Sequence, residues 1–144
     1  MEATWALITP KIHDNFDVKH IAVASIYYAK RTRRKDFIDH ICEAYNVLLA
    51  RYGQGLHFII AGDYNRLDIR PILNLSPSLS QLVTIPTRTN PDTTLDKIIS
   101  TLGKYLPPTS LPPLDNDVEG IGKPSDHLII VMRPIIQQSN LKPD

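Results

Sequence analysis

Five runs of mostly apolar residues, separated by polar stretches, predict five β-strands along this chain. Two of these runs, residues 20–28 and 127–134, are apolar at nearly every position, which is typical of strands buried on both faces. The polar stretch between the first two runs predicts a hairpin. The five expected strands are residues 4–9, 20–28, 57–63, 93–100 and 127–134.

One long segment, residues 36–52, has the periodicity of an amphipathic helix. Gly53 predicts where that helix ends, because glycine is the usual residue just after a helix. Residues 67–83 predict short helical turns, with Asp68 as a possible N-cap. Residues 103–126, rich in Pro, Gly and Asp, predict a long loop, and loops of that length are usually functional or disordered. The expected buried face of the long helix is Phe37, Ile38, Ile41, Cys42, Tyr45, Leu48 and Leu49.

This set of elements predicts a single α/β or α+β domain built on one mixed, largely buried sheet, with residues 1–144 forming one unit. Five strands and two helical segments cover only one face of such a sheet. The strands are nevertheless apolar on both faces. We therefore expect the second face to be covered by a second sheet, a partner chain or a missing part of this one.

Composition narrows the class of protein. The chain has 42% hydrophobic and 22% charged residues, as in ordinary globular proteins. Cys42 is the only cysteine, which excludes an intramolecular disulfide and favours a core position over a nucleophile. No apolar run approaches the ~20 residues that span a bilayer, and the N-terminus lacks the features of a secretory signal. We expect an intracellular protein, in nucleus or cytoplasm, without membrane partners.

Positive charge is concentrated in residues 30–35, where five of six side chains are cationic. These cations precede the predicted helix, where the helix dipole disfavours each of them by about 0.3–1 kcal/mol. Their position therefore indicates an anionic partner, and DNA phosphates are the expected one. A solvated face and a nuclear-import signal remain alternatives. The expected nucleic-acid contacts are Lys30, Arg31, Arg33, Arg34 and Lys35.

Polar side chains stand in or at the ends of four predicted strands. Each has an ordinary explanation as a turn, cap or surface residue. Together they supply the carboxylates, amide, phenol and imidazole that phosphodiester hydrolysis requires. A Ser-His-Asp relay among Ser125, Asp126 and His127 is excluded because neighbouring side chains on an extended chain alternate in direction. The strand-associated residues are Tyr28, Asp63, Asn65, Asp96, Asp126 and His127.

Four motifs in order, IYYA, AGDYN, TLDKII and SDH, resemble the C-terminal half of the endonuclease/exonuclease/phosphatase (DNase I-like) superfamily. The stretch from GDYNRLDIRP to TTLDKIIS looks most like the endonuclease domains of non-LTR retrotransposons. The resemblance covers roughly residues 5–135. It implies part of a two-sheet sandwich with covering helices. It also implies endonuclease-like nicking of DNA that depends on Mg²⁺ or Mn²⁺.

The resemblance also implies roles for individual residues. Asp63 would orient or activate the attacking water, and Asn65 would bind the scissile phosphate. His127 would stabilise the transition-state oxygens, with Asp96 holding its imidazole in the right tautomer. Tyr28 would donate to the phosphate. The metal would be held by Asp126, Asp63 and Asn65.

Three features depart from the family pattern. Lys30 replaces the proline of the family's Y-x-P motif, and Tyr64 replaces the usual phenylalanine. The Asn and the principal metal-ligating Glu of the family's first half have no counterpart here. We therefore expect residues 1–144 to be a partial domain, with the N-terminal half of the fold, or a reverse-transcriptase domain of a parent polyprotein, as possible partners.

Three functions remain open from the sequence. The first is a metal-dependent endonuclease of a retroelement, with weak or no activity in this chain alone. The second is a catalytically inactive truncated fragment that acts as a nucleic-acid-binding or interaction module. The third keeps the fold but acts on sugar or lipid phosphates instead of DNA.

Overall fold

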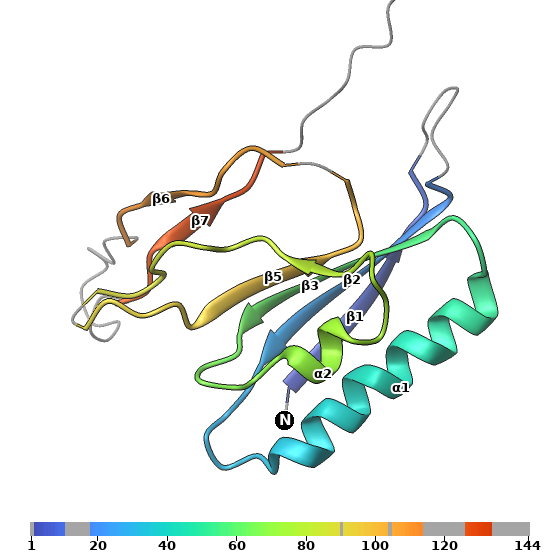
Figure 1. Ribbon diagram of the computed structural model, residues 1–144, viewed down its shortest axis with the longest axis horizontal. Helices are drawn as coiled ribbons and strands as arrows, with labels where there is room; N and C mark the ends of the chain where they lie inside the picture. The colour runs from blue at the N-terminus through green and yellow to red at the C-terminus, as the bar shows by residue number, and fades with distance from the viewer. Residues whose placement is uncertain (1, 11–17, 90, 104, 114–125, 134–144) are drawn as a thin grey trace, which may run out of the picture.

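The computed structural model describes residues 2–10, 18–89, 91–103, 105–113 and 126–133 (Figure 1). Ser125 and Pro134, which belong to the predicted SDH motif and fifth strand, lie outside these residues. No helix in the described ranges is long and apolar enough to cross a membrane. The elements in order are β1 (Glu2–Ile8), β2 (His20–Tyr27), α1 (Arg34–Tyr52), β3 (Leu56–Asp63), α2 (Arg70–Leu73), β4 (Ser80–Gln81), β5 (Asp96–Ser100), β6 (Thr109–Leu111) and β7 (Ile129–Val131).

The main sheet is mixed and has five strands in the order β1-β2-β3-β5-β4 (Figure 1). β1 and β2 are antiparallel, which confirms the predicted hairpin pairing. β2 and β3 are parallel, and α1 connects them because parallel neighbours require a long crossover. β5 runs antiparallel to both β3 and β4. The predicted mixed α and β class is confirmed at this level.

One face of the sheet carries the hydrophobic core. Phe37 and Ile41 of α1 are fully buried, and Tyr45 packs its ring 4.3 Å from the ring of Phe58. Phe58 and Ile60 of β3 point toward this helix, and Ile72 of α2 is buried in the same cluster. Both helices therefore cover the same face. Burial of each large apolar side chain stabilises the fold by about 1.5–3 kcal/mol.

The opposite face of the sheet is only partly covered by the described residues. Side chains alternate along β2, so Val23 and Tyr27 lie on this face beside Ile59 and Asp63 of β3. Tyr27 is 47% exposed and Ile8 of β1 is 48% exposed. The expectation that the helices cover one face alone is met in this part of the chain. Apolar and polar residues therefore meet on the exposed face near the ends of β2 and β3.

The fifth predicted strand does not join the main sheet, so that part of the expectation was wrong. β7 covers only Ile129–Val131 and pairs with β6 in a separate two-stranded sheet. The outer edge of β5 is already occupied by β4, where Ser80 is the partner of Ser100. His127 forms an isolated bridge with Arg88, outside both sheets. β6 lies within the predicted loop and was not expected.

Three element boundaries also differ from the prediction. α1 begins at Arg34 instead of residue 36, so part of the basic cluster forms its first turn. The predicted turns between residues 67 and 83 contain one short helix and β4, and Asp68 precedes the N-cap, Ile69. β5 begins at Asp96 because residues 93–95 bond to the preceding loop, including Thr94 Oγ1 to the carbonyl of Ile85.

Candidate active site

Two carboxylates face each other where β3 ends and β5 begins. Asp63 is the last residue of β3, Asp96 is the first of β5, and the antiparallel register pairs them directly. Directly opposed residues of antiparallel strands place their Cβ atoms about 4.5–5.5 Å apart on the same face. Two like charges in this arrangement repel, so the pair favours a positively charged or proton-carrying neighbour.

The imidazole of His127 is that neighbour. Its Nδ1 lies 2.8 Å from Oδ2 of Asp96, and both side chains are partly buried. Because a carboxylate only accepts hydrogen bonds, Nδ1 carries the proton in this contact. The other ring nitrogen, Nε2, lies 3.8 Å from Oδ1 of Asp126. We call the side chains of Asp63, Asp96 and His127 the 63–96–127 cluster.

A buried hydroxyl that the sequence did not single out fixes the start of β5. Oγ1 of Thr87 accepts hydrogen bonds from the backbone N–H groups of Leu95 and Asp96, each at 3.0 Å. The carbonyl of Thr87 accepts the N–H of Leu128 at 2.7 Å. Thr87 is fully buried, so it holds the backbone on both sides of the Asp96–His127 contact. The only sequence signal is a threonine next to a proline, which is common in loops.

Asn65 connects the exits of β3 and β2. It adopts a positive φ of 49°, which Asn tolerates better than most residues. Its backbone N–H donates to Oδ1 of Asp63 at 2.7 Å, so Asp63 does cap its own turn. Its side-chain Nδ2 donates to the carbonyl of Tyr28 at 2.7 Å. Asp63 can therefore cap the turn and also belong to the site described above, because the turn uses Oδ1 and leaves Oδ2 out of the turn.

The two tyrosines at the end of β2 point in different directions. The hydroxyl of Tyr28 donates to the carbonyl of Thr32 at 3.2 Å, and its ring packs edge-on against Phe37. Tyr27 is paired in register with Asp63 and lies on the same face of the sheet. The register therefore places Tyr27 on the face of the sheet that carries Asp63, whereas the backbone N–H of Tyr28 donates to the carbonyl of Asp63 at 2.9 Å. Strand alternation from Asp63 could have indicated this.

A second residue missed by the sequence analysis is Lys97. Its Nζ donates to the carbonyls of Asn65 and Thr94 at 3.3 and 3.4 Å, and it lies 5.8 Å from the ring centre of buried Tyr64. Burial lowers the pKa of Lys97, while Asp63 and Asp96 act in the opposite direction. Lys97 thus ties the Asn65 turn to β5. Its signal in the sequence was a lysine inside an apolar strand pattern.

Asp126, expected to hold a metal, forms an ion pair with Nε of Arg88 and is half exposed. No group of three or more His, Cys, Asp or Glu side chains in the described part of the chain is arranged to hold a metal ion. The donor chemistry still fits Mg²⁺, which binds oxygen ligands and often takes only one or two carboxylates from a protein. Asp63, with Oδ2 outside the turn, and Asp126 are the carboxylates that could serve.

The predicted DNA-binding cations do not act as one group. Lys35 pairs with Asp39 on α1, and Arg34 donates to Asp68 at 3.0 Å. Lys30, Arg31 and Arg33 are exposed.

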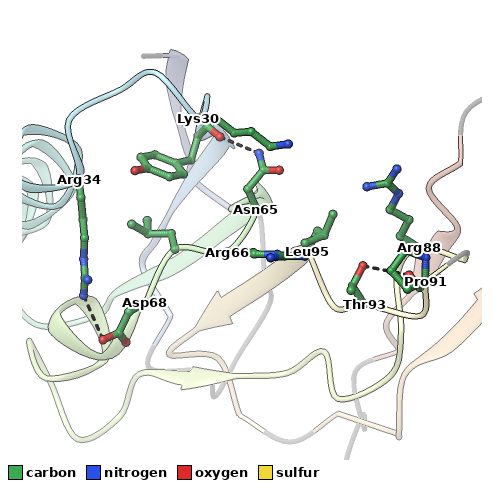
Figure 2. Close-up of a pocket in the computed structure, with 11 residues that line it drawn as sticks. Lys30, Arg34, Asn65, Arg66, Asp68, Arg88, Pro91, Thr93 and Leu95 are labelled. Carbon is green, nitrogen blue, oxygen red and sulfur yellow. Dashed lines mark hydrogen bonds and ion pairs between the residues drawn. The ribbon is translucent and has the colours of Figure 1, made fainter.

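A cavity of about 520 Å³ lies beside Asn65, and of the basic cluster only Lys30 and Arg34 line it (Figure 2). We call it the cationic pocket. Its walls are Tyr28, Lys30, Arg34, Asn65, Arg66, Leu67, Asp68, Arg88, Pro91, Thr93 and Leu95.

The sequence matches no protein-family model and no curated protein. Inferences about function therefore depend on the contacts within the chain. They bring Asp63, Asn65, Asp96 and His127 into one continuous set, from three segments of the chain. Tyr28 is joined to this set through Asn65, and Asp126 lies beside His127.

Proposed function

We propose that the protein hydrolyses phosphodiester bonds and nicks DNA, as a metal-dependent endonuclease of the DNase I-like type. The observation that carries the proposal is the contact of His127 with Asp96, directly opposite Asp63. A buttressed imidazole beside a second carboxylate provides a donor for a developing oxyanion and a group that orients water. Four motifs in family order support the same reaction.

Each residue of the 63–96–127 cluster has a distinct part in this proposal. Asp63 positions the attacking water through its free oxygen. Asp96 accepts from Nδ1 of His127 and so directs Nε2 away from β5. Nε2, when protonated, donates to a phosphate oxygen. Asn65 and Tyr27, next to Asp63 through the turn and the β2–β3 register, contribute further polar contacts to the phosphate.

The metal would be held by Asp63 and Asp126, with Asn65 adjacent. When bound, Mg²⁺ polarises the phosphate oxygens and neutralises charge that develops on them. Asp126 would have to exchange its ion pair with Arg88 for this role. The proposed two-sheet sandwich would place a second sheet on the exposed face that carries Asp63 and Tyr27.

The test is conversion of supercoiled plasmid to the open-circular form in the presence of Mg²⁺. Asp63→Asn and His127→Ala should each lower the rate by about 10²-fold or more. Asp39→Asn is the matched control, because Asp39 is an exposed carboxylate on α1 that pairs with Lys35. Nicking that is equally fast in wild type and in Asp63→Asn would overturn the proposal.

A second function is favoured by one specific observation. The Arg88–Asp126 ion pair engages a carboxylate that the reaction needs for the metal. The chain would then bind nucleic acid without cutting it. Steep loss of DNA binding with added salt, with no nicking at any Mg²⁺ concentration, would support this alternative.

A further inference from the structure

The cationic pocket is built from four separate segments that converge next to the proposed active site. The loop after β2 contributes Lys30, and the start of α1 contributes Arg34. The turn after β3 contributes Asn65 and Arg66, and the loop before β5 contributes Arg88. Figure 2 shows Arg34 with Asp68 at one end of the pocket and Arg88 at the other, with Lys30, Asn65 and Arg66 between them. The pocket and the proposed site share Asn65.

Charge in the pocket is positive on balance, although Arg34 pairs with Asp68 and Arg88 pairs with Asp126. Four cationic side chains line it, against the single carboxylate of Asp68. Asp68 is already occupied by Arg70, at 2.6 Å, and by Arg34, at 3.0 Å. Within the described residues, no carboxylate lies within ion-pair distance of Lys30 or Arg66. Uncompensated cations gathered around a cavity raise the local concentration of an anionic ligand.

The size and the remaining walls define the ligand further. A cavity of about 520 Å³ falls within the usual range for small-molecule sites, ~300–1,000 Å³. Leu67 and Leu95 supply apolar surface, and the Asn65 amide and Thr93 supply hydrogen-bonding groups. Phosphate plus a sugar or base matches this mixture of charge, polar groups and apolar wall. A simple inorganic anion would leave the apolar wall unused.

We propose that the cationic pocket binds one nucleotide of the DNA strand that flanks the scissile phosphate, with Lys30 and Arg66 on its phosphate. The proposal rests on the proposed function, since it assumes a DNA substrate. It divides the basic cluster into two parts. Lys30 acts in the pocket together with Arg66, which lies 36 positions later in the sequence, whereas Arg31 and Arg33 do not line the pocket.

The test is DNA binding by the full chain in EDTA, so that cleavage plays no part. Fluorescence anisotropy of a labelled duplex is measured from about 50 to about 200 mM KCl. Lys30→Gln with Arg66→Gln should weaken binding about tenfold or more at low salt and reduce the slope of log K against log salt by about 1.8. The matched control is Arg31→Gln with Arg33→Gln, which removes the same charge from exposed positions outside the pocket.

The control pair should change the slope less than half as much as the pocket pair. Equal effects of the two pairs, or no effect of the pocket pair, would overturn the proposal. Melting temperatures confirm that the variants fold, as expected for substitutions at exposed side chains.

A third arm identifies the source of the nucleotide. If deoxyadenosine monophosphate binds in a manner that needs Lys30 and Arg66 while duplex binding does not, the pocket serves free nucleotides and the strand assignment is overturned. A selective loss of duplex binding in the pocket pair supports the assignment to the DNA strand, whether or not the wild type nicks plasmid. Failure of the wild type to nick plasmid overturns only the proposed hydrolysis. If the wild type nicks plasmid, but the pocket pair and the control pair change the salt slope equally, only the pocket proposal is overturned.

Discussion

Nδ1 of His127 lies 2.8 Å from Oδ2 of Asp96, although 31 positions separate the two residues in the sequence. The contact fixes which ring nitrogen faces the sheet, and the other, Nε2, lies 3.8 Å from Oδ1 of Asp126. It also joins the segment before β7 to the first residue of β5. If the proposed reaction is right, this pair sets the orientation of the group that donates to the phosphate.

Replacing Asp96 with Asn should lower plasmid nicking by about 10²-fold or more, because an amide no longer fixes the His127 tautomer. The measurement is the nicking rate as a function of pH. A positioning role predicts that the pH profile changes together with the rate. If the rate falls with an unchanged profile and a lower melting temperature, Asp96 acts only on stability.

Tyr27→Phe and Tyr28→Phe should have different effects on nicking. Tyr27 is paired in register with Asp63, whereas the hydroxyl of Tyr28 already donates to the carbonyl of Thr32. Loss of one transition-state hydrogen bond from Tyr27 should cost about tenfold in rate. Tyr28→Phe should leave the rate within about twofold of the wild type. It removes one hydrogen bond within the loop, which contributes about 1 kcal/mol or less. The reverse order would support the role expected for Tyr28 from the sequence.

Thr87→Val should destabilise the protein by about 2 kcal/mol or more. The valine keeps the shape but leaves the N–H groups of Leu95 and Asp96 without their acceptor in a fully buried place. Urea denaturation measures the free energy of unfolding. Thr84→Val is the control, because Thr84 is exposed and should change stability by about 0.5 kcal/mol at most. Thr87→Ser, which keeps the hydroxyl, should recover most of the loss.

Gly62→Ala should prevent stable folding or cost more than about 3 kcal/mol. A Cβ at Gly62 would lie 1.9 Å from the carbonyl oxygen of Ile26, and the φ of 146° is itself unfavourable for alanine. That oxygen belongs to the backbone of β2, which cannot shift without disrupting its pairing with β3. Gly103→Ala, where a Cβ meets nothing within 4 Å, should be nearly neutral in the same denaturation experiment.

The stability of the protein should fall in acid partly through Asp68. The guanidinium and backbone N–H of Arg70 hold the pKa of Asp68 well below its ordinary value. A depressed carboxyl pKa stabilises the fold above the unfolded value of about 3.9, and the contribution is lost as pH falls below it. Melting temperatures of Asp68→Asn should therefore decline less than wild type between about pH 4 and about pH 2. Parallel curves would show that this ion pair adds nothing to the fold.

The sequence predicted α1, β2 and β3 well because their apolar positions face one continuous core. It missed β4 and β6 because two or three residues are too short for a pattern to emerge. Whether β7 joins the main sheet depends on whether another strand already occupies the edge of β5. The hydrophobic pattern of residues 127–134 contains no information about this.

The candidate site divides in the same way. The resemblance of the motifs TLDKII and SDH pointed to Asp96 and His127, and the structure brings these two residues into contact. Thr87 and Lys97 were missed because they act on backbone groups of other segments, which no spacing in the sequence reveals. The ion pair of Arg88 with Asp126 likewise joins residues that are distant in the chain.

The hydrogen bond from Nδ2 of Asn65 to the carbonyl of Tyr28 locks together the loops that leave two parallel strands. One loop carries Lys30 and the other follows directly from Asp63. If the proposed function holds, this rigid connection would set the distance between the nucleotide bound in the cationic pocket and Asp63. A cut would then fall at a constant offset from that nucleotide.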